Sequence, residues 1–429
     1  MSLAYRASTG DQPTVVVVGG GIIGLCAAWH LQRDGARVTL IERDEPGRSC
    51  SFGNAGAISS SSVAPLAMPG AALSAIGMLL DRNGPLYIPP LYAFVAASWL
   101  LRFVRASRRS EVERIATALS SLLKQSAQHH RRLVREIGAS DLLQNGGQLH
   151  LYRNATQLNK DKASWDLRRQ HGLIAETLDR SALLDLEPDL GSAYTTGIYI
   201  ADQDTCVNPY RYSLTLAEDF TRIGGRIVQD EACDILLHDG VAVGARGSIE
   251  TYISDHTVVC AGAWSSRLLS PLGYSVPLET QRGYHVDLTN PGVRPRRTVI
   301  AADRKIFITP METGLRTAGT VEFGGLERPP SVRRAALLLR HLAEVYPAAQ
   351  QVNASKYWMG NRPCLPDSLP VLGRSFRNRG LWFGFGHGHL GLTMSAVSGD
   401  LLARMVLGRP VDIAMEAYSI DRYATSFAR

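Results

Sequence analysis

The sequence predicts an α/β protein (α+β overall) with two parts. One is a Rossmann-like dinucleotide-binding domain, and the other is a domain built around a mixed or antiparallel sheet. Two observations support this class. A strand, a glycine-rich turn, a helix and a second strand follow one another near the N-terminus. Helices and strands alternate at both ends of the chain, whereas residues 283–323 are mostly strands.

The first predicted unit begins with a buried parallel strand, because residues 14–18 form an apolar, β-branched run. Gly19, Gly21 and Gly24 follow it in the spacing G-x-G-x-x-G, which is typical of dinucleotide sites when a helix comes next. The rest of the unit consists of a helix with Ile23, Ala27, Ala28 and Leu31 on one side, a stop at Gly35, and a strand over residues 37–41 that ends on Glu42.

These residues limit the class of ligand. Gly19 permits the tight turn, Gly21 lets a pyrophosphate approach the backbone, and Gly24 lets the helix pack against the strand. The helix N-terminus adds free N–H groups for the phosphates. Glu42 accepts hydrogen bonds from ribose hydroxyls and repels a 2′-phosphate. The unit therefore predicts NAD or FAD rather than NADP; the alternative is a glycine-rich turn in an ordinary strand–helix–strand unit.

Composition excludes several classes of protein. The chain has 429 residues, of which 45% are hydrophobic and 20% charged, as in globular proteins. The net charge of +7 comes from scattered arginines without a long basic run, so nucleic-acid binding is not expected. Six cysteines lie far apart, with no metal-binding spacing, which suits a reducing compartment. No signal peptide and no apolar run of transmembrane length is evident, so we expect a cytoplasmic protein without a metal site.

One apolar segment has two interpretations. Residues 91–104 read LYAFVAASWLLRFV, interrupted by Arg102 and followed by Arg105, Arg108 and Arg109. The first interpretation is a buried helix with a solvated basic end. The second is a peripheral membrane contact through residues 91–109, with the apolar face in the membrane interface and the arginines at anionic headgroups.

The other elements follow from periodicity and chain breakers. Residues 48–69 are too polar for a core and too long for a simple turn, so they predict a loop that covers a ligand. Prolines at positions 85, 89 and 90 precede a long amphipathic helix over residues 111–137. The remaining predicted helices cover residues 161–172, 180–186, 209–223, 332–345 and 392–406, and the remaining strands cover 148–152, 197–200, 226–228, 256–261, 283–288, 298–301, 305–309, 314–323 and 381–384.

This order of elements predicts that the nucleotide domain is discontinuous in sequence. We expect residues 14–80, 190–275 and 358–425 to form it. We expect residues 81–189 and 276–357 to form the substrate domain, with a helical insert.

Four later segments carry residues suited to a site. In residues 51–56, SFGNAG, small residues let the backbone approach a flat ring, although a plain glycine loop looks the same. Residues 258–264, VVCAGAW, indicate a strand that ends in a small-residue turn beside the dinucleotide, or a generic strand-to-helix turn. Residues 358–367 carry Arg362 between stiffening prolines, and a guanidinium can hold a carboxylate through two hydrogen bonds. Alternatively, Arg362 is a surface residue in a rigid loop.

The fourth segment, residues 384–393, reads GFGHGHLGLT. Its glycine-rich backbone and the following helix N-terminus suit the stabilisation of negative charge on a reduced flavin. His387 and His389 stand two residues apart, but no third ligand for a metal is evident.

Taken together, these segments resemble the superfamily of FAD-dependent oxidoreductases that includes D-amino-acid oxidase, glycine oxidase and sarcosine oxidase. Among its members the chain most resembles the bacterial D-amino-acid dehydrogenases. Their patterns G-G-G-I-I-G, S-F-x-N-A-G-x-I-S and A-P-x-A-x-P-G match residues 19–24, 51–59 and 64–70. Their later patterns W-x-G-x-R-P-x-x-P-D-x-x-P and G-H-G-x-L-G-x-T match residues 358–370 and 386–393. The resemblance spans nearly the whole chain.

The resemblance implies non-covalently bound FAD and roles for single residues. Arg362 matches the arginine that pairs with the substrate carboxylate, and Tyr284 falls where the family places a strand beside the substrate. His285 and His389 are candidates for tuning the substrate amine or for shaping the pocket. The implied FAD contacts are Gly19, Gly21, Ile22, Ile23, Gly24, Glu42, Arg43, Ser51, Asn54, Ala55, Gly56, Ile58, Ala232, Cys260, Ala261, Gly262, Trp264, Gly388, His389, Leu390, Gly391, Leu392 and Thr393.

The activity that this resemblance implies is dehydrogenation of a D-amino or cyclic D-imino acid, by hydride transfer from the α-carbon to flavin N5. Arg282, His285 and His389 depart from the Lys-Gly-Tyr-Ser and small-residue forms of the dehydrogenases. Those changes suggest another side-chain specificity, such as 4-hydroxy-D-proline. A quinone or another electron carrier is the expected acceptor. The alternatives are an amine oxidase of sarcosine or glycine type, which Cys364 fits poorly as a flavin attachment point, and a flavin domain that modifies tRNA.

Overall fold

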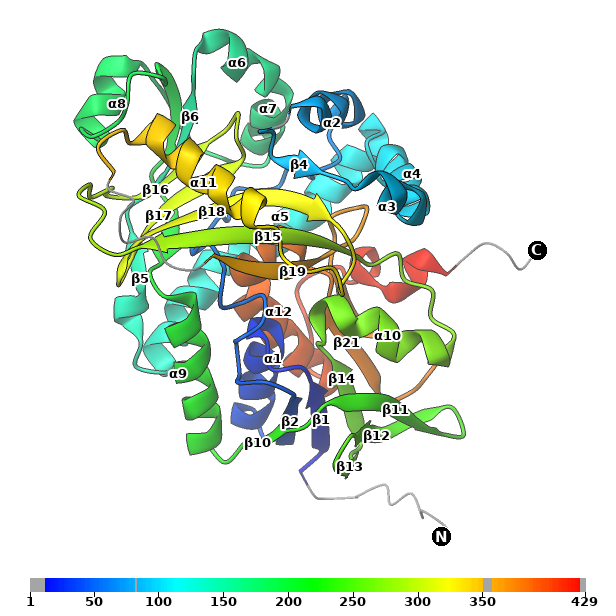
Figure 1. The fold of residues 1–429 in the computed structure, drawn as a ribbon. Helices are drawn as coiled ribbons and strands as arrows, with labels where there is room; N and C mark the ends of the chain where they lie inside the picture. Colours follow the sequence, from blue (N-terminus) through cyan, green and yellow to red (C-terminus); the bar gives the residue numbers. More distant parts are fainter. Residues whose placement is uncertain (1–11, 82, 350–356, 425–429) are drawn as a thin grey trace.

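The computed structural model describes residues 12–81, 83–349 and 357–424. Two large sheets are stacked in the view of Figure 1: the sheet that contains β1 and β14 lies below, and the sheet that contains β15–β18 lies above it. The segments that contribute to each sheet lie far apart in the sequence. The space between the two sheets is where the candidate site forms.

The lower sheet has six strands in the order β10-β2-β1-β14-β21-β20. All neighbours are parallel except β20, which is antiparallel to β21. After Thr14, β1 consists of four buried valines, as expected where both faces of a sheet are covered. The strands are β1 (Thr14–Val18), β2 (Arg37–Glu42), β10 (Arg226–Gln229), β14 (His256–Val259), β20 (Val371–Arg374) and β21 (Leu381–Phe385).

Alternate residues of β1 contact two different cores. Val15 and Val17 face the helices α1, α5, α9 and α12, whereas Val16 and Val18 face a small three-stranded sheet and helix α10. The helices are α1 (Ile22–Arg33), α5 (Arg109–Glu136), α9 (Pro209–Arg222), α10 (Ser265–Leu269) and α12 (Gly391–Val406), and the small sheet is β11 (Ala232–His238), β12 (Val241–Gly247) and β13 (Thr251–Ile253).

The upper sheet has nine strands in the order β19-β15-β18-β17-β16-β6-β8-β7, with β4 paired to β18. Helix α11 (Val332–Val345) packs on one face of it, where Tyr284, Val286 and Leu338 are buried. The strands are β4 (Leu86–Tyr87), β6 (Gln148–Tyr152), β7 (Glu176–Leu178), β8 (Thr196–Ile200), β15 (Glu279–Leu288), β16 (Thr298–Ala301), β17 (Ile306–Met311), β18 (Gly314–Phe323) and β19 (Trp358–Cys364).

The remaining elements lie around these two sheets. A short sheet of β3, β9 and β5 joins the covering loop to the substrate half. The elements are β3 (Ala57–Ile58), β5 (Leu143–Asn145), β9 (Asp204–Cys206), α2 (Ala71–Leu80), α3 (Pro90–Val95), α4 (Ala97–Ala106), α6 (Ala155–Lys160), α7 (Lys162–Gln170), α8 (Arg180–Leu186), and the 3-10 turns η1 (Ser140–Leu142), η2 (Gly262–Trp264), η3 (Ser270–Leu272), η4 (Gly388–Leu390), η5 (Glu416–Tyr418) and η6 (Ile420–Tyr423).

The proline-stiffened segment around Arg362 is a strand, β19, which the sequence did not predict. Pro363 is compatible with this strand because β19 lies at the edge of the sheet and pairs with β15 alone. β19 and β8 belong to the nine-stranded sheet, although the predicted limits place both in the nucleotide domain. Sheet membership therefore favours assigning them to the substrate domain. The domain limits otherwise stay a prediction, and positions 82, 350–356 and 425 within them lie outside the described residues.

The first interpretation of residues 91–104, a buried helix with a solvated basic end, is wrong. The segment folds into the two short helices α3 and α4, and much of its apolar surface faces solvent. Leu91 is 83% exposed and Phe94 is 82% exposed, whereas Trp99 turns inward at 5%. Within the described parts of the chain, no helix is long and apolar enough to cross a bilayer.

Candidate active site

A cavity of about 1120 Å³ runs between the two sheets. At one end its wall contains Gly19, Gly21 and Glu42, and at the other end it reaches residues of α2, α4 and α7. Its middle is lined by the covering loop, by β15, β18 and β19, and by the start of α12. The cavity therefore joins the predicted nucleotide site to the predicted substrate site.

The N-terminus of α1 opens into this cavity without a side-chain cap. Gly21 is the N-cap residue, so the first turn has unfilled N–H groups. Two neighbouring N–H groups are already used: Gly20 N–H donates to Glu42 Oε2 (2.5 Å), and Ile22 N–H donates to Ser51 Oγ (3.0 Å). The remaining N–H groups and the positive end of the helix dipole suit a pyrophosphate.

The close packing of this turn explains two of its glycines. Gly19 has a φ of +106°, and a Cβ there would lie 2.5 Å from the Cys260 carbonyl oxygen. A Cβ on Gly24 would lie 1.9 Å from the Gly19 carbonyl oxygen. Gly24 therefore allows α1 to pack closely against β1, as the sequence predicts. It does not line the cavity.

Glu42 lies at the end of β2 and lines the cavity. Its two carboxylate oxygens accept from the backbone N–H groups of Gly20 (2.5 Å) and Asp44 (3.1 Å). Burial raises the pKa of Glu42, and those two hydrogen bonds act in the opposite direction. Each oxygen keeps a further lone pair for a ribose hydroxyl.

The same end of the cavity carries an arginine stacked on an indole. The Arg43 guanidinium lies 4.2 Å from the centre of the Trp264 ring, and both residues line the cavity. Ala232 and residues 260–262 complete this wall. These residues are among the FAD contacts that the sequence predicts.

The substrate half holds the loop at residues 51–56 in place. Arg316 of β18 donates to the carbonyl oxygens of Phe52 (3.1 Å) and Asn54 (2.8 Å), and it is paired with Asp287. The Asn54 side chain accepts from Gly56 N–H (2.9 Å). This loop is therefore fixed by a side chain of β18.

The C-terminal glycine segment forms the turn η4 and the start of α12. No side chain caps α12, and Gly391, Leu392 and Thr393 line the cavity at its N-terminus. The Thr393 hydroxyl accepts from Ser59 N–H (3.1 Å) and donates to the Ala57 carbonyl oxygen (3.3 Å). A positive helix end is thus joined to the covering loop, as expected for a group that stabilises charge on a flavin ring.

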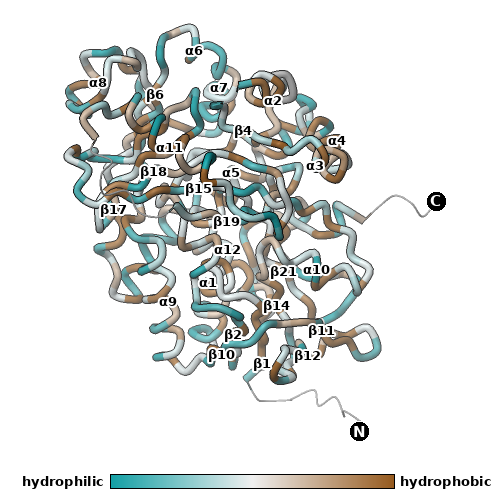
Figure 2. Tube along the Cα trace, viewed as in Figure 1, coloured by the Kyte–Doolittle hydropathy of each residue, from teal (hydrophilic) through white to brown (hydrophobic). Residues whose placement is uncertain are grey.

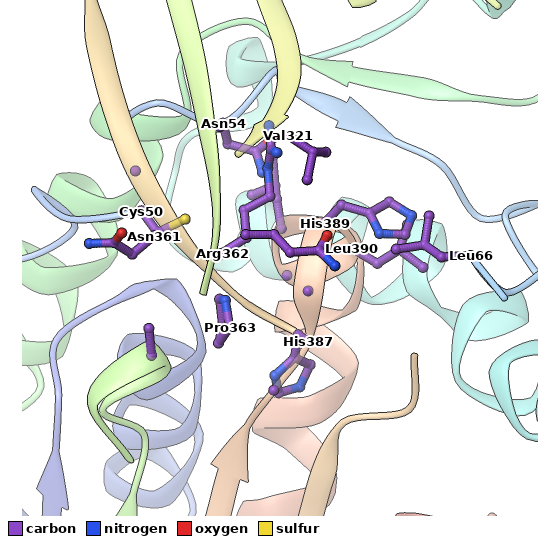
Figure 3. Close-up of a pocket in the computed structure, with 18 of the residues that line it drawn as sticks. Cys50, Asn54, Leu66, Val321, Asn361, Arg362, Pro363, His387, His389 and Leu390 are labelled. Atoms are coloured by element: carbon purple, nitrogen blue, oxygen red, sulfur yellow. The ribbon is translucent and has the colours of Figure 1, made fainter. Parts of the chain in front are cut away.

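Arg362 projects into the middle of the cavity. Figure 3 shows it between Asn54 and His389, with Leu66 beyond the histidine. Its Nη1 donates to the Thr320 carbonyl oxygen (3.0 Å), and no carboxylate of the described chain lies within 4.0 Å of it. A Cβ on Gly283 would lie 2.0 Å from the guanidinium, so Arg362 lies flat against β15 only because residue 283 is glycine.

The four residues Arg282–His285 point to alternate sides of β15. Arg282 is fully buried on the side away from the cavity, where it lies 3.4 Å from Glu322. Tyr284 lines part of the cavity, but its hydroxyl donates to Glu322 (2.5 Å) and accepts from Ser331 N–H (3.0 Å). The Tyr284 hydroxyl is therefore occupied within the protein.

His285 lies behind the cavity wall. Its ring stacks on Trp358 at 5.0 Å between centres, and its Nδ1 lies 3.2 Å from the Gly53 carbonyl oxygen. Neither Arg282 nor His285 lines the cavity, so the change of specificity expected from these two residues does not come from direct contact.

His389 lines the cavity, and its side chain is exposed there. Desolvation by the cavity walls, followed by the positive charges of Arg362 and Arg168, lowers its pKa to about 4. His389 is therefore neutral at pH 7. His387 is buried, its Nε2 lies 3.1 Å from Ser398 Oγ, and burial lowers its pKa to about 3.

The structure brings most of the expected residues together around the cavity. It places Gly24, Gly56, Ile58 and His285 outside the cavity wall. Gly56 serves the backbone of the loop, since its φ is +76° and a Cβ would lie 2.3 Å from the Cys206 carbonyl oxygen. Among the described residues, no group of three or more His, Cys, Asp or Glu side chains could hold a metal ion.

Two cavity residues were not found from the sequence. Thr320 has a φ of +57°, a rare conformation for a β-branched residue, and it places its carbonyl oxygen against Arg362. Arg168 of α7 lines the far end of the cavity. In the sequence Arg168 cannot be distinguished from the neighbouring Arg169, and nothing in the sequence shows the strained backbone at Thr320.

Comparison with known proteins identifies the family. The model of the FAD-dependent oxidoreductases known as DAO matches residues 14–405. The chain belongs to this family. The site fits an elongated dinucleotide. The N-terminus of α1 has no side-chain cap, Gly19 and Gly24 stand where a Cβ would clash with the backbone, and the cavity extends from Glu42 to the N-terminus of α12. This oxidoreductase therefore uses FAD.

Two curated relatives and one solved structure illustrate the similarity. A D-amino-acid oxidase from Bradyrhizobium diazoefficiens is 36% identical over 95% of this chain and 98% of its own length. A D-amino acid dehydrogenase from the same organism is 31% identical over 96% of this chain and 99% of its own length. Glycine oxidase from Geobacillus kaustophilus superposes with a TM-score of 0.76 at 21% identity, covering 96% of this chain and all of that chain, and so shares the fold.

Proposed function

We propose that this oxidoreductase dehydrogenates a D-amino acid, or a cyclic D-imino acid such as 4-hydroxy-D-proline, at the α-carbon. The observation that carries the proposal is the Arg362 guanidinium, a cation without a carboxylate partner among the described residues, in the cavity that also contains the FAD cradle. The names of the relatives supply the D configuration and the amino-acid class. A carboxylate bound in the cavity would complete the pairing of Arg362 through parallel hydrogen bonds.

Each residue near Arg362 has a task in this mechanism. Arg362 holds the carboxylate, and Gly283 and the Thr320 carbonyl oxygen fix the plane of the guanidinium. When bound, FAD would supply the two-electron acceptor for the hydride that the α-carbon loses. The neutral His389 shapes the pocket beside the substrate and adds no positive charge that would oppose the loss of hydride.

We further propose that FAD is held without a covalent bond. Cys364, the cysteine near Arg362, is 2% exposed and does not line the cavity. Burial raises its pKa to about 12, so the thiol is protonated and a poor nucleophile at neutral pH. Retention of the flavin by acid-precipitated protein would contradict this part of the proposal.

The relatives' names differ in the electron acceptor that they imply, since one is named an oxidase and the other a dehydrogenase. We propose an apolar carrier such as a membrane quinone, on the cytoplasmic side of the inner membrane. The far wall of the cavity supports this choice, because Leu66, Ile76, Leu79, Leu100 and Phe103 line it. These residues belong to the same surface region as the exposed apolar side chains of α2–α4.

That surface suits an anionic bilayer. Figure 2 shows hydrophobic residues along α2, α3 and α4. Residues 82–110 contain no Asp or Glu, and the exposed Arg102, Arg105 and Arg108 follow the apolar residues. The exposed large side chains are Leu66, Ile76, Leu79, Leu80, Tyr87, Leu91, Phe94, Val95, Leu101 and Val104.

Vesicle sedimentation tests the membrane contact. We expect the protein to sediment with phosphatidylglycerol vesicles more than with phosphatidylcholine vesicles. The double substitution Leu91→Ser and Phe94→Ser should abolish binding, whereas Ile249→Ser should not, because Ile249 is 80% exposed in a turn between β12 and β13. Equal sedimentation of both variants would contradict the assignment of the surface.

Anaerobic reduction of the flavin tests the reaction itself. The flavin absorbance of the purified protein is followed with D-amino acids, D-proline, both 4-hydroxy-D-prolines, their L-forms, glycine and sarcosine. We expect bleaching by D-forms alone. Bleaching only by glycine or sarcosine would show an amine oxidase instead, and bleaching by L-forms would contradict the stereochemistry.

A further inference from the structure

Part of the covering loop has its carbonyl oxygens held by the substrate sheet. Arg316 Nη1 donates to the carbonyl oxygens of Phe52 (3.1 Å) and Asn54 (2.8 Å). His285 Nδ1 lies 3.2 Å from the carbonyl oxygen of Gly53, the residue between them. Three consecutive carbonyl groups are therefore held by two side chains, one from β18 and one from β15.

His285 is the donor in its contact with the loop. Burial is the main cause that lowers the pKa of His285 to about 4, so its ring is neutral at pH 7 and carries one hydrogen. A carbonyl oxygen can only accept, so this hydrogen is on Nδ1. His285 is 2% exposed, and its ring centre lies 5.0 Å from that of Trp358 and 6.1 Å from that of Phe52. These neighbours fix the direction of the donor.

Arg316 is held in place by a carboxylate. Its Nε and Nη2 donate to the two carboxylate oxygens of Asp287 at 2.7 and 2.8 Å, across the paired strands β15 and β18. This bidentate pair fixes the plane of the guanidinium and leaves Nη1 for the loop. Neither Arg316 nor Asp287 lines the cavity, so Arg316 uses its donors within the protein.

The backbone of the same segment forms part of the cavity wall. Gly53, Asn54 and Ala55 line the cavity, and a Cβ on Gly53 would lie 2.0 Å from the Trp358 ring. Asn54 N–H donates to the Ser51 carbonyl oxygen (3.2 Å), whereas the N–H groups of Gly53 and Ala55 have no acceptor among the described residues. Enclosed backbone N–H groups are nearly always paired in folded proteins. Two unpaired ones beside a cofactor cavity indicate an acceptor on the cofactor.

We propose that His285 and Arg316 are positioning residues for the flavin. They hold the carbonyl oxygens of residues 52–54 against the substrate sheet, which leaves the N–H groups of Gly53 and Ala55 for polar atoms of the flavin ring. Donors at the ring stabilise its electron-rich reduced form, so they favour electron transfer into it. The effect on turnover rests on the proposed function.

The test removes the His285 donor and measures the bound flavin without any substrate. His285→Leu removes the donor, whereas His285→Asn keeps one, because the Asn amide nitrogen and His Nδ1 are both bonded to Cγ. We expect His285→Leu to make the midpoint potential of the flavin more negative and to change its visible spectrum. His285→Asn should restore both toward the wild-type values.

Steady-state kinetics give a second measurement. With the best amino-acid substrate and an artificial electron acceptor, kcat should fall about tenfold in His285→Leu. KM should change less than about twofold, because Arg362 is unaltered.

A second variant and a matched control complete the test. Arg316→Lys keeps the charge beside Asp287, but an ammonium cannot reproduce the planar fork that holds two carbonyl oxygens, so it should shift the potential in the same direction. His341 is also buried, and its Nε2 lies 3.1 Å from the carbonyl oxygen of Asn83, in a different loop. His341→Leu should lower Tm without changing the potential or the spectrum, because His341 does not line the cavity.

The outcomes decide between positioning and a purely structural role. An unchanged potential and spectrum in His285→Leu would overturn the proposal. So would a loss of FAD affinity alone, since the loop would then contact another part of FAD. If His285→Leu does not retain FAD, His285→Asn decides: a wild-type spectrum supports the proposal, and loss of FAD there as well contradicts it. If no D-amino acid reduces the wild-type flavin, the proposed function fails, yet the substrate-free measurements still test the positioning.

Discussion

The two ends of the cavity are built from different parts of the chain. At the cofactor end, the groups that face a ligand are mostly backbone N–H groups at the starts of α1 and α12, and glycines hold them in place. At the substrate end they are side chains, above all Arg362, which arrives from β19. Backbone groups bind what every FAD shares, whereas side chains decide which substrate fits.

This difference predicts that substitutions at the two ends of the cavity have different effects on flavin binding and on KM. Changes at the cofactor end should remove the flavin or the fold altogether, because backbone packing does not tolerate an added atom. Changes at the substrate end should leave the flavin in place and alter KM. The following predictions test that separation, beginning with the largest effect.

The largest effect is expected at Gly24. A Val side chain there would bring Cβ within 1.9 Å of the Gly19 carbonyl oxygen, a backbone atom, so α1 would have to move away from β1. Gly24→Val should abolish flavin retention, measured as the ratio of absorbance at flavin and protein wavelengths. Gly77→Ala on α2 is the matched control, because a Cβ there meets nothing within 4 Å. Full flavin content in Gly24→Val would refute the packing argument.

Arg362→Ala should retain FAD and lose affinity for substrate. Removing one partner of a buried charge pair costs about 2–5 kcal/mol, which corresponds to a rise in KM of roughly 30-fold or more. Steady-state kinetics with the best D-amino acid measures the effect, and the flavin spectrum shows that the cofactor remains. A change of KM below about tenfold would move the carboxylate anchor to another residue.

Acid should destabilise the cofactor half. Burial lowers the pKa of His30 and His387 to about 3 and that of His130 to about 4, below the value of about 6.5 in an unfolded chain. Between pH 6.5 and 4 the unfolded chain therefore binds more protons than the folded one. The free energy of unfolding falls as the pH drops through this window, by about 1.4 kcal/mol per pH unit for each such group.

Melting temperature and flavin fluorescence measured from pH 7.5 to pH 5 check this prediction. We expect both to be constant above about pH 7, and then to show a falling Tm and released flavin. A Tm that does not change between pH 7 and pH 5 would contradict the buried, neutral state of these histidines.

The smallest effect is expected at Thr320. Its φ of +57° is strained for a β-branched residue, and its buried hydroxyl has no partner in the described structure. Thr320→Gly should relieve about 1 kcal/mol and raise Tm by about 1–2 °C. It should also raise KM moderately, because the carbonyl oxygen that fixes Arg362 is held less firmly. A lower Tm together with an unchanged KM would show that the strain has no role at the site.

The contrast between the two ends also explains what could be predicted from the sequence. The β1–α1–β2 unit follows from glycine spacing and periodicity, because its function depends on local backbone geometry. Strands β15–β18 and helix α11 also follow from the periodicity of their apolar residues and from chain breakers. The resemblance to a family located Arg362, although its position on an edge strand beside Gly283 is visible only in the structure.

Other features depend on contacts between distant segments, which local patterns do not encode. Arg168 and Arg169 look alike in sequence, yet only Arg168 faces the cavity, because Trp165 fixes the rotation of α7. His285 looked like a site residue but stacks on Trp358 behind the cavity wall. The apolar segment at residues 91–104 looked buried, because apolar content alone does not show whether a neighbouring element covers a helix.

The most direct test of the account is a binding titration with a carboxylate that cannot react. Propionate is added to the oxidised, flavin-containing protein, and the visible flavin spectrum is recorded, with propionamide as the uncharged control. We predict a saturating spectral change with propionate, none with propionamide, and loss of the change in Arg362→Gln with the flavin still bound. An equal response to propionate in wild type and Arg362→Gln would contradict the claim that Arg362 holds the substrate carboxylate beside the flavin.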